Sequence, residues 1–149
     1  MKIKNYIIVC IAFMLSVSVF SQQGKQKRAD TLFNKFSFIK AAEVYRDLIE
    51  NKYNADYATR KLADCYALLR DPRNASRYYK KVVTQKNIPI EYYYNYAQSL
   101  RGIKDYKESE VWLQRFKDSG GVVNANDFSK NANFITSVFN AKQQYFLDR

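Results

Sequence analysis

The side chains best suited to chemistry in this sequence are three carboxylates and one thiol. Asp64, Glu108 and Glu110 could act as acids or bases, but the sequence pairs no two of them at the separation that such catalysis needs. Cys65 is expected inside a helix as a buried, unreactive thiol. The sequence contains no histidine, which is the commonest general base and metal ligand. We therefore expect a protein that is not an enzyme and that uses no metal or cofactor.

A second set of side chains is spaced for binding. Its members fall on the outward stripe of the first helix in each of three predicted repeat units, where they would line the concave face of an array. An ordinary solvated surface is the competing interpretation for each of them. The candidate groove residues are Gln26, Asp30, Phe33, Arg60, Asp64, Ala67, Tyr94, Gln98 and Arg101.

The elements that must position these side chains are helices repeated every 34 residues, the spacing that separates Ala29, Ala63 and Ala97. Apolar residues follow helical spacing in both halves of a unit, and Asp71 before Pro72 is typical of a helix start. Each unit is therefore predicted to be a pair of helices. The same shift relates Leu32 to Tyr66 and Leu100, Phe38 to Pro72 and Tyr106, Ala41 to Ala75 and Ser109, Tyr45 to Tyr79 and Leu113, and Leu48 to Val82 and Phe116.

The tyrosine-rich stretch EYYYNYAQSL begins the third unit. Tyr93 and Tyr96 share a helical stripe with Ala97, so we expect both rings in the core. Tyr94 shares a more polar stripe with Gln98, and its ring is expected to face the open groove.

The units resemble the tetratricopeptide repeat in LADCYALLRDPRNASRYYKKVV and YAQSLRGIKDYKESEVWLQRF. The resemblance covers residues 22–118 and implies an all-α fold of three helical hairpins, stacked as a right-handed solenoid. It also implies a scaffold that binds a protein or peptide through its concave face. The three predicted hairpins span about residues 22–55, 56–89 and 90–118.

The sequence departs from the family pattern at a few positions. Ser109 and Leu113 replace the expected alanine and aromatic residue of the third unit, and Phe36 stands near a position that is often glycine. Chaperone-binding members have lysine and asparagine where this chain has Gln26 and Asp30. We therefore do not expect that ligand.

Residues 1–21 have the layout of a signal peptide, because Lys2 and Lys4 precede an apolar run and Ser21 suits the cleavage site. The protein is therefore expected in the periplasm or at the outer membrane, and an uncleaved anchor is the alternative. Removal of the two lysines leaves 23 basic residues against 14 acidic ones, a net charge of +9. For an exported protein of this charge, envelope components are available partners and nucleic acid is not expected.

Residues 122–149 resume a helical pattern and are predicted to form a C-terminal capping helix, which is unfinished at Arg149. The whole layout resembles the N-terminal segment of the OmpA-family proteins of Bacteroidota that act with type IX secretion and gliding. This implies a periplasmic scaffold that continues into further domains. Two alternatives stay open. One is a freestanding periplasmic adaptor, and the other is a basic surface that binds anionic membrane or nucleic acid through Arg70, Arg73, Arg77, Lys80 and Lys81 around Tyr78.

Overall fold

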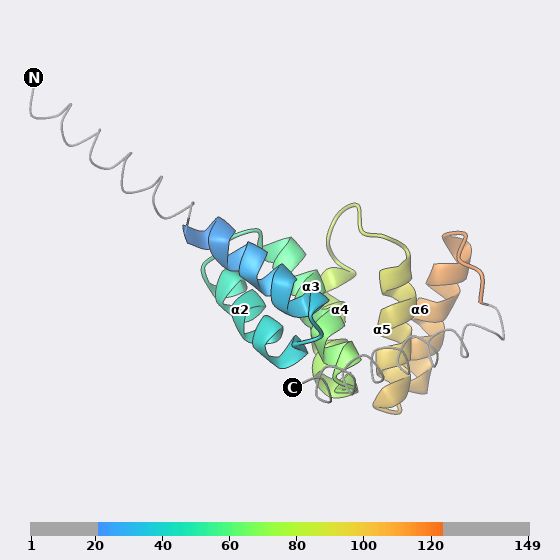
Figure 1. Ribbon diagram of the computed structural model, residues 1–149. Coiled ribbons are helices and arrows are strands. Elements are labelled where there is room, and N and C mark those ends of the chain that lie inside the picture. The colour runs from blue at the N-terminus through green and yellow to red at the C-terminus, as the bar shows by residue number, and fades with distance from the viewer. Residues whose placement is uncertain (1–20, 124–149) are drawn as a thin grey trace, which may run out of the picture.

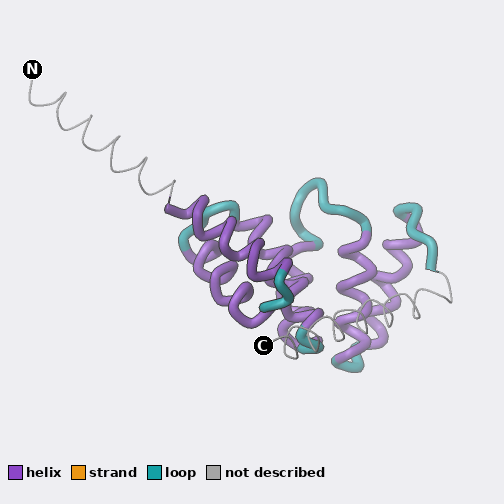
Figure 2. Tube along the Cα trace, in the orientation of Figure 1, coloured by secondary structure: helices purple, strands orange, loops and turns teal. Residues whose placement is uncertain are grey.

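The protein is described by a computed structural model that covers residues 21–123 (Figure 1). Within this range all regular elements are helices, as Figure 2 shows, so the expected all-α class is confirmed for the described part. The predicted signal peptide up to residue 20 and the predicted capping helix from residue 124 lie outside it. The described helices are residues 21–34, α2 (Phe38–Glu50), α3 (Ala55–Leu68), α4 (Pro72–Val82), α5 (Glu91–Gly102) and α6 (Tyr106–Asp118).

From α2 to α6, each helix packs mainly against its neighbours in the chain (Figure 1). One buried cluster joins helix 21–34 to α2 and α3, and a second joins α3, α4 and α5. Helix α3 contributes to both, through Leu62 and Cys65 to the first and Ala63 to the second. None of the described helices combines the length and the apolar character that crossing a membrane requires.

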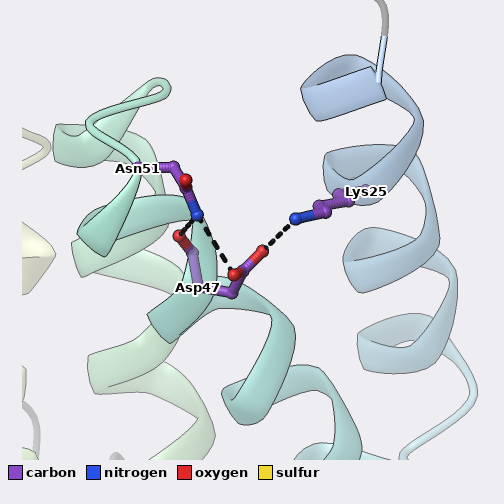
Figure 3. A network of polar contacts seen from close by, with 3 residues as sticks. All are labelled: Lys25, Asp47 and Asn51. Atoms are coloured by element: carbon purple, nitrogen blue, oxygen red, sulfur yellow. Dashed lines mark hydrogen bonds and ion pairs between the residues drawn. The ribbon is translucent and has the colours of Figure 1, made fainter. Parts of the chain in front are cut away.

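A surface ion pair also links helix 21–34 to α2. Lys25 Nζ lies 2.6 Å from Asp47 Oδ2, and Asn51 donates to the same aspartate (Figure 3). Both charged side chains are about two-fifths exposed, at 40% and 42%. Exposed pairs of this kind contribute little to stability, typically below about 1 kcal/mol.

Burial follows the 34-residue period of the sequence. Ala29, Ala63 and Ala97 are at most 1% exposed. Tyr106 departs furthest from this period, because it is 63% exposed whereas Phe38, its counterpart in the first unit, is buried. Phe38 packs edge-on against Phe33 and Phe36. Their counterparts in the third unit are Arg101 and Lys104, so these two positions of the described chain give Tyr106 no aromatic neighbour. The other buried columns are Ala41, Ala75 and Ser109, and Leu48, Val82 and Phe116.

The backbone of the turns repeats with the same period. Phe36, Arg70 and Lys104 are 34 residues apart, and all three adopt the left-handed conformation, with φ of 58°, 57° and 66°. In each turn the following residue donates its N–H to a carbonyl five residues earlier, as in Asp71 N to Tyr66 O at 2.9 Å. This is the Schellman arrangement that ends many helices.

The starts of α2, α4 and α6 differ in how they are capped. Asp71 accepts a hydrogen bond from the backbone N–H of Asn74 at 3.0 Å, and Asp105 accepts one from Glu108 at 3.3 Å. Ser37 stands at the same boundary before α2, but its side chain makes no capping hydrogen bond. The expected N-cap role of Asp71 is therefore confirmed.

The expected core aromatic residues are buried to different degrees. Tyr96 is 4% exposed and Tyr79 is 1% exposed. Tyr93 is only half-buried, against the Trp112 ring at 5.7 Å. Cys65 is fully buried, and burial raises the pKa of its thiol to about 12, so it stays protonated at neutral pH.

Candidate functional site

The candidate groove residues of the first two units are engaged with the neighbouring unit or loop. Gln26 Oε1 accepts from Asn54 Nδ2 at 3.2 Å, which joins helix 21–34 to the turn before α3. The Phe33 ring has Lys61 Nζ 4.4 Å from its centroid. The candidate groove residues lie on helix 21–34, α3 and α5, and we call this set the first-helix stripe. In the first two units this stripe connects successive units.

Asp30 lies at a junction of three helices. Its Oδ1 atom accepts a hydrogen bond from the Tyr45 hydroxyl of α2 at 2.7 Å and another from the Tyr57 hydroxyl of α3 at 2.8 Å. The tyrosine rings themselves meet edge to face, with centroids 6.4 Å apart. The carboxylate therefore ties the first pair of helices to the second.

Asp64 repeats this arrangement one unit later. Its Oδ1 atom accepts from the Tyr79 hydroxyl of α4 at 2.9 Å, and its Oδ2 atom accepts from the Tyr92 hydroxyl of α5 at 3.3 Å. Burial raises the pKa of Asp64, and burial also raises the pKa of Tyr79 well above its usual value. We call the two sets the tyrosine–aspartate clusters. In the third unit, Gln98 and Leu113 occupy the aspartate and tyrosine positions.

The three carboxylates that were considered for acid–base chemistry have separate surroundings. Asp64 is held between two tyrosine hydroxyls in the second cluster. Glu108 and Glu110 lie exposed on α6, where Glu108 accepts from Trp112 Nε1 at 2.8 Å. In residues 21–123 no group of three histidine, cysteine or acidic side chains is arranged to hold a metal ion.

The stripe residues of the third unit have different surroundings. The Tyr94 ring is half-buried against Phe116, with centroids 5.4 Å apart, rather than open to solvent as expected. Its hydroxyl is buried and has no hydrogen-bond partner in the described part of the chain. Gln98 is half-buried and Arg101 is exposed.

The structure brings Gln26 and Asp30 together in a surface hollow of about 620 Å³. The hollow lies between helix 21–34 and the turn that connects α2 to α3. Its other lining residues, which sequence reasoning missed, are Gln23, Gly24, Lys27, Tyr53 and Asn54. The spacing of Gln23, Gln26, Lys27 and Asp30 is that of one helical face and could have indicated this side of the helix. The turn residues carry no such signal.

Arg60 makes the remaining stripe contact. Its guanidinium donates to Gln85 Oε1 at 3.1 Å, and the amide of Gln85 donates to the Asp56 carbonyl at 3.2 Å. These two bonds hold the loop between α4 and α5 against α3.

No protein-family model and no curated protein matches the chain. The resemblance to tetratricopeptide repeats and to the OmpA-family proteins stays a prediction. The function has to be inferred from the residues described above.

Proposed function

We propose that this chain is a non-enzymatic interaction scaffold of the tetratricopeptide type, exported to the periplasm or the outer membrane. Its three hairpins form a right-handed solenoid whose concave face binds a protein or peptide. The observation that best supports the repeat is the 34-residue recurrence of the left-handed turn at Phe36, Arg70 and Lys104. Such arrays act through extended surfaces rather than through catalytic groups.

The hollow beside helix 21–34 supports a peptide as the ligand. Three of its side chains are amides, from Gln23, Gln26 and Asn54. Each amide offers both donors and an acceptor, which suits the N–H and C=O groups of an extended backbone. Lys27 and Asp30 add one charge of each sign, so a partner with mixed charge fits this end of the surface.

The wider role follows from the layout of the chain. In this proposal the array is the N-terminal segment of an OmpA-family envelope protein that works with secretion or gliding machinery. A freestanding periplasmic adaptor is the alternative. Reading the coding sequence beyond Arg149 separates them, because an in-frame peptidoglycan-binding domain favours the first and a stop codon favours the second.

Photo-crosslinking in the native host tests the binding surface. A crosslinking amino acid is introduced at Gln23 or Lys27, which are exposed and line the hollow, and at Lys40 or Lys117 as controls on α2 and α6. We expect a discrete crosslinked protein from the first two positions and none from the controls. The same products from all four positions, or none from the hollow, would contradict the proposal. Fractionation of the same cells tests export.

A further inference from the structure

Helix α4 has one wholly basic face. Among α2 to α6 it is the one helix without an acidic residue. Its core side presents Ala75, Tyr79 and Val82, which are at most 1% exposed. Its cations recur at helical spacing on the opposite side, and all of them are exposed. We call this set the α4 basic face; its members are Arg73, Arg77, Lys80 and Lys81.

Helix stability does not account for this pattern. Arg73 lies in the first turn, near the positive end of the helix dipole, and like charges four residues apart repel one another. Only Lys80 and Lys81, in the last turn, have favourable positions. Asp71 is the nearest acid in sequence. It accepts hydrogen bonds from the backbone and side chain of Asn74, and its carboxylate also interacts with the charge of Arg73. The charge of the α4 basic face is therefore mostly uncompensated by α4 itself.

Within residues 21–123 none of these four cations forms a salt bridge. The one salt bridge within residues 21–123 joins Lys25 to Asp47, on other helices. The exposed faces of α2 and α6 mix both signs of charge, as in Glu43 with Arg46 and Glu110 with Lys107. An external anion would therefore compensate charge that this chain leaves exposed.

A pair of tyrosines holds part of the basic face in place. The rings of Tyr66 and Tyr78 stack, with centroids 5.5 Å apart and planes 14° from parallel. Lys81 Nζ lies 5.4 Å and Arg77 Cζ lies 5.9 Å from the centroid of Tyr78. Arg46 of α2 donates to the Tyr66 hydroxyl at 2.7 Å, which adds a fifth cation beside the pair. Cation–π contacts of this kind already restrict these long side chains in the free protein. The side chains therefore lose less conformational entropy on binding.

We propose that the α4 basic face, together with Arg46, binds an acidic segment of a protein partner. Arg73, Arg77 and Lys81 follow one another at intervals of about 6 Å along the helix. Alternate residues of an extended chain are about 6.6 Å apart. A segment with an acidic residue at every second position therefore matches the three cations in turn, and arginine can bind a carboxylate through two parallel hydrogen bonds.

Two other anionic partners fit this surface less well. A nucleobase that stacked on Tyr78 would compete with the ring of Tyr66 and with the cations that already contact Tyr78. A membrane-surface helix needs exposed apolar side chains to insert, and the large exposed hydrophobic residues of the described chain lie elsewhere than on α4. A carboxylate segment requires neither feature.

This surface is separate from the first-helix stripe, because the stripe belongs to helix 21–34, α3 and α5. The two proposals can therefore fail independently. Loss of crosslinking at Gln23 says nothing against the α4 basic face, and loss of acidic-peptide binding says nothing against the hollow.

Fluorescence anisotropy with a labelled peptide of alternating glutamate and serine tests the proposal on the full mature chain. The test variant replaces the four residues of the α4 basic face with glutamine. The control variant makes the same change in charge at four exposed lysines elsewhere, Lys35, Lys40, Lys86 and Lys117. We expect about tenfold or greater weakening in the test variant, less than about threefold in the control, and binding that weakens as salt is added.

Three outcomes would overturn the proposal. The first is an equal loss in both variants, which would mean that net charge alone attracts the peptide. The second is equal binding of a glutamine–serine peptide. The third is tighter binding to phosphatidylglycerol vesicles or to oligothymidylate than to the acidic peptide. If the fourfold variant loses helical circular dichroism, Arg77→Gln with Lys81→Gln is compared with Lys40→Gln and Lys117→Gln under the same criteria.

Discussion

The hydroxyl of Tyr79 donates to Asp64 across 2.9 Å, and this bond ties α4 to the helix that precedes it. Tyr45 and Asp30, each 34 residues earlier, make the same bond at 2.7 Å. A third helix joins each cluster through a further tyrosine hydroxyl. The tyrosine–aspartate clusters are thus repeated polar ties in an array that is otherwise held by apolar packing.

Tyr79→Phe should lower the free energy of unfolding by about 1–3 kcal/mol, because it removes a hydrogen bond from the half-buried carboxylate of Asp64. Urea denaturation followed by circular dichroism measures the change. Tyr106→Phe is the matched control, since Tyr106 is 63% exposed, and it should leave stability unchanged. Equal stability of the two variants would show that the Asp64 bond is dispensable.

The clusters should also make the protein sensitive to alkali. Burial, followed by the hydrogen bond to Asp30, raises the pKa of Tyr57 to about 12, whereas an unfolded tyrosine ionises near 10. The unfolded chain therefore releases this proton first, so the stabilisation is complete below about pH 10 and is lost as pH rises towards 12. Urea midpoints measured from pH 8 to 12 should fall over that window.

Tyr57→Phe should make this fall shallower. It should not abolish it, because burial also raises the pKa of Tyr45 and Tyr92. An identical slope for the variant and the parent protein would argue that Tyr57 does not titrate from a buried site.

Asp71→Ala should cost about 1 kcal/mol of stability, because it removes the hydrogen bond to the N–H of Asn74 at the start of α4. The chain offers its own control in Ser37, which stands at the corresponding boundary without a capping bond. Ser37→Ala should therefore be close to neutral. Thermal denaturation of both variants makes the comparison, and equal losses would rule out a capping effect specific to Asp71.

The repeat period and most of the core could be predicted from the sequence. Close packing of two helices requires a small residue at the same place in every unit, so Ala29, Ala63 and Ala97 mark the register without knowledge of the structure. The exposure of Tyr106 could not be predicted from its column alone. In the first unit Phe33 and Phe36, from other columns, pack against the residue of this column. In the third unit Arg101 and Lys104 occupy their positions.

The contacts of the predicted groove residues were harder to foresee. Helical spacing assigns Asp30 and Asp64 to a polar stripe, and it assigns Tyr45 and Tyr79 to the core. It does not indicate that each hydroxyl reaches across to the carboxylate. The second tyrosines of the two clusters, Tyr57 and Tyr92, are 35 residues apart and so fall outside the 34-residue columns. Whether the stripe also binds a partner stays a prediction.

Lys104→Gly should stabilise the protein by about 0.5 kcal/mol. Lys104 has a φ of 66°, which is unfavourable for a residue with a Cβ atom and costs nothing extra for glycine. The greater freedom of glycine in the unfolded chain offsets part of the gain. Glu110→Gly provides the control, because glycine at this exposed position inside α6 should cost about 1 kcal/mol. Urea unfolding should therefore move the two midpoints in opposite directions. A loss of stability in both variants would be inconsistent with a left-handed turn at Lys104 and would weaken the backbone evidence for the 34-residue repeat.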